Sequence, residues 1–423
     1  MMDDAARAPR ASWPLPPGVA PWVRRILVAR ALRAFTDGYV AVLLPTYLLA
    51  LGMGWLDLGL ISTSTLAGSA LATLAIGAIA GRIANRTLLL GAALLMAATG
   101  AAFAGLSDFW PLAMVAFVGT LNPSSGDVSV FLPVEHAELA GAAPNADART
   151  ALFARYTLIG SLFGALGALG AAIPAWLTTH SAIAPLDALR AMFAAYGVVG
   201  VLVWWLYRGV ADVSGQTRAR GSALVHSRRT VLRLAALFCI DSFAGGLLVN
   251  ALLAAWLLQR FGMSLAAAGT FFFWSGLCTT ASQLLAPYVA RRIGLLRTMV
   301  FTHIPASCFL IGAAVSPNLS LALALLLARS SLSQMDVPAR SAFVMAVVTP
   351  EERVAAASFT AVPRSLASAC GPSLGGALLA GGWLAAPLLA CGMLKISYDI
   401  ALLISFRHHR DAQEPAHARS HRP

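Results

Sequence analysis

Residues 120–129 read TLNPSSGDVS and follow LAMVAFVG at residues 112–119, an apolar run that is typical of a lipid-buried helix. Polar groups at that depth are costly, because the hydrocarbon core of a bilayer offers them no hydrogen-bond partners. A second stretch, RSSLSQMDVP at residues 329–338, again combines serines, a proline and the pair Asp-Val. We interpret both stretches as walls of a water-accessible cavity inside a helical membrane protein.

The composition supports a membrane protein. The 423-residue chain is 58% hydrophobic and 11% charged, whereas soluble domains carry about 25% charged residues. The net charge of +12 comes almost entirely from arginine, since Lys395 is the only lysine. No basic face interleaved with aromatic residues is evident, so we expect no nucleic-acid partner. The five cysteines lack metal or redox spacing, and no nucleotide-binding or catalytic motif stands out. We therefore expect no cofactor, no metal and no enzymatic activity.

Apolar segments long enough to span a bilayer recur along the whole chain. The predicted spans are 26–50, 57–80, 87–107, 109–132, 150–175, 189–207, 234–257, 265–289, 298–316, 318–343, 355–380 and 384–406. Arginines gather in alternate connections, such as those with Arg86, Arg229 and Arg407, whereas the opposite set holds little beyond Arg190 and Arg260. The positive-inside rule then places both termini in the cytoplasm.

The longest polar connection, residues 208–233, is rich in Gly, Ser and Arg and is predicted to be a flexible cytoplasmic linker. It separates an N-terminal six-helix bundle at 26–207 from a C-terminal six-helix bundle at 234–406. Residues 1–25 and 407–423 are expected to be cytoplasmic tails.

The two halves resemble each other in sequence. Asp127-Val128 matches Asp336-Val337, and the same spacing separates Arg155 from Arg364. GMGWLDLG from Gly52 and GMSLAAAG from Gly262 also correspond. Several matches in one order indicate an internal duplication, which is common in transporters that bind substrate at the repeat interface.

With this six-plus-six layout and the charged connection after the second span, the chain resembles the major facilitator superfamily of secondary transporters. In that family the connection usually reads Gly-x-x-x-Asp-Arg-x-Gly-Arg-Arg. Here Gly77, Arg82 and Arg86 fit, but Gly81 replaces the acid. The resemblance implies an all-α polytopic fold with twelve transmembrane helices in two pseudo-symmetric bundles. It also assigns Arg82 to a cytoplasmic gate.

The resemblance further implies that the first, fourth, seventh and tenth spans line a central cavity. Each of these spans carries one aspartate: Asp37, Asp127, Asp241 and Asp336. Together with Asn122 they are candidate substrate-binding or proton-binding groups. A charge inside the membrane is a functional candidate by default, and a partner is expected for it.

Asp37 has a candidate partner on its own helix. Arg33 lies four residues earlier, on the same helical face. Asp37 is then either a carboxylate that couples transport to protons or one half of a static ion pair with Arg33, and the sequence leaves both open.

A symmetric set of ion pairs is a second candidate. Asp127 with Arg155, and Asp336 with Arg340 or Arg364, could close the cytoplasmic mouth of the cavity. The alternative is that the two aspartates bind substrate or protons directly.

The last span holds Lys395 and Asp399, four residues apart. Because the resemblance makes this span peripheral, we expect a self-contained ion pair, with Tyr398 as a possible hydrogen-bond donor; an anion-binding lysine is the alternative. His303 is read as a buried structural histidine rather than a proton relay. The acids after the fourth and tenth spans, including Glu135 and Glu352, are expected to face loop arginines.

The expected function is secondary active transport of a small molecule by alternating access, with proton-coupled efflux favoured by the resemblance. Uptake of a metabolite or sugar by proton symport is the alternative, and a non-transporting scaffold or receptor is a third possibility. We expect a multi-pass protein of the bacterial inner membrane, working as a monomer. Its expected partners are the lipid bilayer, the substrate and a coupling proton.

Overall fold

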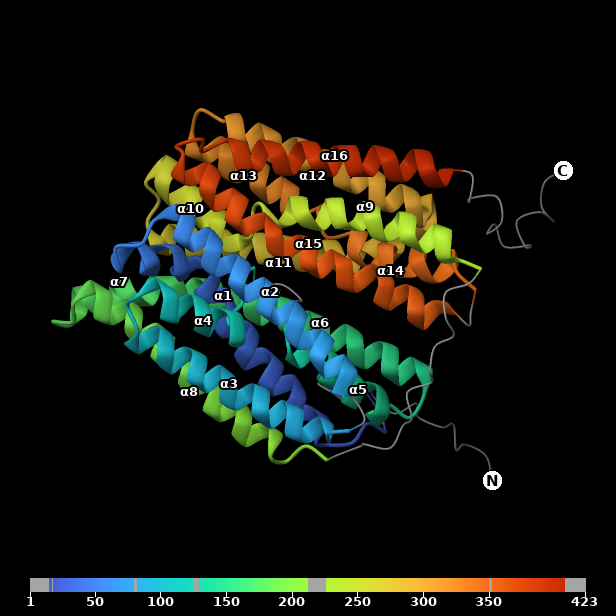
Figure 1. Ribbon diagram of the computed structural model, residues 1–423, viewed down its shortest axis with the longest axis horizontal. Coiled ribbons are helices and arrows are strands. Elements are labelled where there is room, and N and C mark those ends of the chain that lie inside the picture. Colours follow the sequence, from blue (N-terminus) through green and yellow to red (C-terminus); the bar gives the residue numbers. More distant parts are fainter. Residues whose placement is uncertain are drawn as a thin grey trace, which may run out of the picture. The chain divides into compact units, whose positions relative to one another are not determined.

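The computed structural model describes residues 15–16, 18–79, 82–124, 129–211, 226–349 and 352–407. Within these ranges the chain is almost entirely helical and contains no strand element (Figure 1). The chain forms two compact units. The first comprises Met1–Gly54, Ser64–Arg218 and Met263–Phe273, and the second comprises Trp55–Thr63, Ala219–Gly262 and Trp274–Pro423.

The N-terminal part of the chain supplies the first eight helices. They are α1 (Val23–Ala50), α2 (Trp55–Ile79), α3 (Asn85–Gly105), α4 (Phe109–Val118), α5 (Phe131–Ala142), α6 (Ala146–Leu169) with the short 3-10 helix η1 (Gly170–Ala172), α7 (Ile173–His180) and α8 (Pro185–Tyr207). The C-terminal part supplies α9 (Arg228–Gly246), α10 (Asn250–Phe261), α11 (Leu265–Ile293), α12 (Leu295–Val315), α13 (Leu319–Ser330), α14 (Asp336–Ala346), α15 (Arg353–Ala380) and α16 (Ala386–Phe406).

The two polar stretches interrupt helices and do not form polar helical faces. The predicted span at 109–132 is two helices, α4 and α5, and the predicted span at 318–343 is α13 and α14. The first break begins at Gly119 and contains a turn in which Asn122 Oδ1 accepts hydrogen bonds from Ser124 N (3.1 Å) and Ser124 Oγ (2.8 Å). An asparagine side chain that satisfies the backbone in this way competes with helix formation, which the neighbouring Pro123 also opposes.

Within the described residues, seven helical stretches are long and apolar enough to cross a membrane, among them Arg228–Phe261, which contains α9 and α10. Three further helices, α1, α11 and α15, are 28, 29 and 28 residues long, which is also sufficient, but they are more polar. The fourth and tenth predicted spans consist of shorter helices. The number of twelve spans therefore stays a prediction, whereas the all-helical membrane fold is confirmed.

The internal duplication is visible in the backbone. The matching residues Gly52 and Gly262 follow the ends of α1 and α10, and both have positive φ angles, 83° and 62°. Such a left-handed residue after a helix is a common helix ending that favours glycine. Corresponding helices also pair alike, since α1 packs on α6 and α9 on α15, while α3 packs on α8 and α12 on α16.

Small residues set the closest helix contacts. A Cβ atom added to Gly100 of α3 would lie 2.3 Å from the backbone nitrogen of Gly197 in α8. Likewise, a Cβ atom on Gly246 of α9 would lie 2.2 Å from the carbonyl oxygen of Ser368 in α15. Membrane helices approach this closely only where side chains are small.

Candidate functional site

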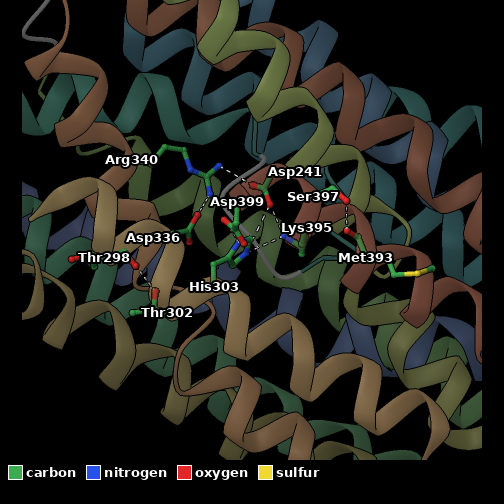
Figure 2. A network of polar contacts seen from close by, with 10 residues as sticks. All are labelled: Asp241, Thr298, Thr302, His303, Asp336, Arg340, Met393, Lys395, Ser397 and Asp399. Atoms are coloured by element: carbon green, nitrogen blue, oxygen red, sulfur yellow. Dashed lines mark hydrogen bonds and ion pairs between the residues drawn. The ribbon is translucent and has the colours of Figure 1, made fainter. Parts of the chain in front are cut away.

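Six ionisable side chains from four helices meet inside the second unit (Figure 2). They are Asp241 on α9, His303 on α12, Asp336 and Arg340 on α14, and Lys395 and Asp399 on α16. We call these six residues the charged cluster. His303 and Lys395 lie near the middle of 21-residue helices, so the cluster belongs in the membrane interior, where charges require partners.

Asp241 is the centre of the charged cluster, with cations at both of its carboxylate oxygens. Lys395 Nζ donates to Oδ1 at 2.7 Å, and a guanidinium nitrogen of Arg340 lies 3.3 Å from Oδ2. His303 Nε2 is 3.8 Å from Oδ1. The aspartate is only 4% exposed, so these contacts replace the water that a buried carboxylate has lost.

His303 lies between Asp399 and Lys395 and contacts both. Its Nδ1 lies 3.0 Å from Asp399 Oδ2, and its Nε2 lies 3.3 Å from Lys395 Nζ. A lysine ammonium can only donate, so this second contact is a hydrogen bond when Nε2 carries no proton. The arrangement then fits a neutral imidazole that donates from Nδ1 to Asp399 and accepts at Nε2 from Lys395.

Asp336 is the first residue of α14, directly after the break that separates α13 from α14. It forms an ion pair with Arg340, four residues later on the same helix. Arg340 therefore joins two carboxylates, Asp336 and Asp241, and couples the broken tenth span to the seventh.

The charges of the cluster do not balance. Its three carboxylates, on Asp241, Asp336 and Asp399, face two permanent cations, Arg340 and Lys395. With neutral His303 the six side chains carry one net negative charge. One bound proton makes the cluster neutral. An unbalanced buried charge is costly.

An apolar wall surrounds the charged cluster. Phe238 and Tyr398 are each 1% exposed; the guanidinium carbon of Arg340 lies 5.5 Å from the centre of the Phe238 ring. The Tyr398 hydroxyl has no hydrogen-bond partner within the part of the chain that the structure describes. The expectation that Tyr398 donates to the Lys395–Asp399 pair is therefore wrong.

The first unit holds a different arrangement, a buried ion pair between two helices. Arg33 on α1 pairs with Glu135 on α5, and the pair is fully buried. Tyr156 and Tyr207 donate hydrogen bonds to the two oxygens of the Glu135 carboxylate at 2.5 and 2.7 Å. The Arg33 guanidinium also lies 4.0 Å from the centre of the Phe131 ring. This ion pair is electrically balanced, which is what a structural anchor requires.

One predicted ion pair is contradicted by the observed contacts, and the Arg33–Asp37 pair stays a prediction. The self-contained Lys395–Asp399 pair is wrong, because Lys395 pairs with Asp241 and Asp399 with His303. The physical reason is that Lys395 reaches an acid on α9, which packs on α16. Arg33, offered as the partner of Asp37, forms its ion pair with Glu135.

The other candidate residues are scattered over the fold. Asp336 and Arg340 form the predicted pair, but Arg340 also contacts Asp241. Asn122 is buried within the break between α4 and α5, whereas Arg82 is exposed. Asp127 lies outside the described residues. The remaining three, Asp37 on α1, Arg155 on α6 and Arg364 on α15, are half-buried.

The sequence analysis missed two acids that it assigned to loop contacts. Glu135 is buried against Arg33, and Glu352 accepts backbone N–H groups of His226 and Ser227 at 2.8 Å each, directly before α9. The sequence did contain a signal for the burial of Glu135. Glu135 and Glu138 share one helical stripe with Phe131, Val134 and Leu139, and acids inside an apolar stripe indicate burial.

No group of three or more His, Cys, Asp or Glu side chains in the described ranges is arranged to hold a metal ion.

The chain shares its sequence pattern with known membrane proteins. The family model of the Major Facilitator Superfamily matches residues 26–330 and 234–422. An uncharacterised membrane protein of Saccharomyces cerevisiae is 24% identical over 411 residues, which cover 89% of this chain and 92% of that protein.

Solved transporter structures share the fold at low sequence identity. A bacterial homologue of the human lysosomal transporter Spinster, inward-facing and occupied, has a TM-score of 0.69 at 13% identity, with 93% of this chain and 96% of that chain covered. A D-xylose–proton symporter has a TM-score of 0.69 at 15% identity, covering 90% and 97%. A nucleoside transporter has a TM-score of 0.70 at 13% identity, covering 92% and 100%. The chain therefore belongs to the Major Facilitator Superfamily, and it is a membrane transporter rather than an enzyme.

Proposed function

We propose that this protein is a proton-coupled secondary transporter that moves a small molecule across the plasma membrane by alternating access, with the coupling proton held in the charged cluster. The observation that carries the proposal is the charge imbalance, three carboxylates against two permanent cations and one histidine. One proton makes the cluster neutral. Asp37, which is half-buried on α1, is the second candidate for the proton site.

A proton held in this way can drive a conformational change. A ligand shifts an equilibrium between two states only if it binds them with different affinity. A cluster closed off from water tolerates its net charge less well than one that is open to water. Protonation therefore favours the closed form, and release of the proton favours the open form.

Two coupling modes are compatible with a proton in the charged cluster. Exchange of an exported substrate for an entering proton is the mode that the family resemblance favours. Co-transport of substrate and proton is the second candidate, and the position of Lys395 between His303 and Asp241 favours it, as developed below.

The test is proton flux in liposomes that contain the purified full chain and a pH-sensitive dye. Compound pools are added under an imposed pH gradient, and empty liposomes and the Asp187→Asn variant serve as controls. Asp187 suits this role because its side chain is 63% exposed and its ion pair is with Arg190, which is not part of the charged cluster. A compound-dependent proton flux is expected in the wild type and in Asp187→Asn.

The same pools are then applied to Asp241→Asn and Asp37→Asn. Flux that is lost in Asp241→Asn and kept in Asp37→Asn supports the charged cluster as the proton site. Flux that is lost only in Asp37→Asn assigns the coupling proton to the first unit. Compound movement without proton flux in the wild type contradicts proton coupling altogether. The direction of proton movement relative to the compound decides between exchange and co-transport.

A further inference from the structure

Two positive groups compete for one oxygen atom in the charged cluster. Lys395 Nζ is 2.7 Å from Asp241 Oδ1, and His303 Nε2 is 3.8 Å from the same Oδ1. The second oxygen, Oδ2, is occupied by Arg340 at 3.3 Å. Lys395 and His303 therefore share the space at Asp241 Oδ1.

The two competitors exclude each other once His303 is protonated. Lys395 Nζ and His303 Nε2 are 3.3 Å apart, a hydrogen bond only while Nε2 is an acceptor. A proton on Nε2 places two cationic donors at this distance, where they repel each other. The same proton gives Nε2 a hydrogen to donate to Asp241 Oδ1, while Nδ1 stays on Asp399 at 3.0 Å.

Lys395 is the partner that can leave. Its side chain is the most exposed of the six, at 13%, compared with 5% for His303 and 0% for Asp399. Its ammonium also lies beside Gly245, the penultimate residue of α9, because a Cβ atom added there would be 3.9 Å from Nζ. At that point α9 gives way to the non-helical link before α10. Discontinuous helices of this kind are where transporters of this general architecture place bound ligands.

His303 is the member of the charged cluster that we expect to change its protonation state. α16 brings Asp399, Lys395, Tyr398 and Cys391 towards it, α9 brings Asp241, α14 brings Asp336 and Arg340, and α13 carries Arg329. The arginines stay charged at any physiological pH. Asp241 and Asp336 face the cations Arg340 and Lys395, whereas Asp399 faces the imidazole of His303, so the His303–Asp399 pair is where an added proton would lie.

We infer that a proton bound at His303 releases the Lys395 ammonium from Asp241 and turns it into the recognition group for an anionic substrate, a carboxylate or phosphate that travels together with the proton. This inference rests on the proposed function and adds the substrate class and the coupling mode. A released ammonium is a donor without an acceptor in an apolar setting, and an anion supplies the missing acceptor.

The charge count agrees with joint binding. The empty cluster carries one net negative charge, and the cluster with a proton and a monoanion carries the same net charge. The proton thus cancels the charge that the monoanion adds to the cluster. The proton alone leaves Lys395 without its acceptor, and the anion alone meets an ammonium that Asp241 still holds.

The test uses the fact that Lys395 is the only lysine in the chain. Full-length protein labelled with ¹³C-lysine and reconstituted in lipid nanodiscs gives one lysine side-chain NMR signal. We expect this signal to shift as the pH is lowered from 8 to 5. We expect benzoate or inorganic phosphate to move it further at pH 5 but not at pH 8, whereas benzamide and benzylamine leave it in place. In His303→Gln the pH-dependent shift should disappear.

The outcomes separate the inference from the proposed function. A lysine signal that stays fixed from pH 8 to pH 5 overturns the release of Lys395, even if compound-dependent proton flux persists. A pH-dependent signal that benzylamine moves, or that none of the four probes moves, overturns the assignment to anions. Loss of all proton flux in liposomes contradicts the proposed function itself. Should His303→Gln fail to fold, the wild-type pH series alone still decides whether Lys395 is released.

Discussion

Buried carboxylates in this protein are satisfied in two different ways. Glu135 has one guanidinium and two tyrosine hydroxyls, and nothing is left over. Asp241 has three cationic or titratable neighbours for two oxygens. In the first arrangement Arg33 and Tyr156 both donate to Glu135 Oε2 and Tyr207 donates to Oε1, and all three bonds form together. The second has two stable arrangements that one proton interconverts.

The ion pair between Asp241 and Lys395 makes a direct prediction for stability. Asp241→Asn leaves a buried ammonium without its counter-charge, and the loss of one partner of a buried pair costs about 3–5 kcal/mol. The double variant Asp241→Asn, Lys395→Met removes both charges and should recover most of this loss. Chemical unfolding in detergent provides the measurement. A double variant as unstable as Asp241→Asn would show that the pair is not the source of the stability.

The tyrosines around Glu135 make a second prediction. Tyr207→Phe removes one hydrogen bond to a buried charged carboxylate, which is worth about 1.5–3 kcal/mol. Tyr288→Phe is the matched control, since Tyr288 is 47% exposed. Unfolding midpoints of the two variants should differ accordingly, with only Tyr207→Phe less stable than the wild type. Equal midpoints would mean that the Tyr207 hydroxyl contributes nothing to the stability of the buried Arg33–Glu135 pair.

At the scale of helices, breaks between helices position residues of the charged cluster. Asp336 begins α14 after the break in the tenth span, and Lys395 lies beside the break between α9 and α10. The sequence located the polar stretches correctly but predicted continuous helices there. The reason is that Asn122 satisfies its own turn, and hydrogen bonds from a side chain to nearby backbone are not visible in a hydropathy pattern.

Glycine in α3 offers a prediction for helix packing with an internal control. Gly100 meets the backbone of Gly197 in α8, whereas a Cβ atom at Gly91 of the same helix has no neighbour within 4 Å. Gly100→Ala should destabilise the protein by about 1–3 kcal/mol, because the two helices must separate. Gly91→Ala should stabilise it by about 0.5–1 kcal/mol through helix propensity. Thermal unfolding compares the two, and a similar effect of both substitutions would contradict the close approach of α3 and α8.

For the whole molecule, the sequence predicted the architecture better than the site. Hydropathy, the arginine distribution and the repeat of Gly52 at Gly262 can be recognised without knowing which helices pack together. They led to the correct family and helical fold. The pairing of Lys395 with Asp241 joins residues 154 positions apart. Such a contact depends on which helices pack together, and the spacing of four residues to Asp399 suggested the wrong partner.

The two units use the same helix pairs for different chemistry. α1 with α6 and α9 with α15 correspond in packing, but the first unit contains the balanced Arg33–Glu135 pair and the second contains the charged cluster. In our account the first unit is the anchor and the second carries the proton. The duplication thus preserved the scaffold, and the side chains that differ between the copies determine the coupling.

The central claim is that the charged cluster carries the coupling proton, and substrate counterflow in liposomes with His303→Gln tests it most directly. Once a transported compound is known, exchange of labelled for unlabelled compound is measured alongside accumulation driven by a pH gradient. The account predicts that His303→Gln loses gradient-driven accumulation, and that its exchange no longer rises as the pH is lowered, because the proton that frees Lys395 for the compound is gone. Gradient-driven accumulation at the wild-type level in this variant would contradict the account.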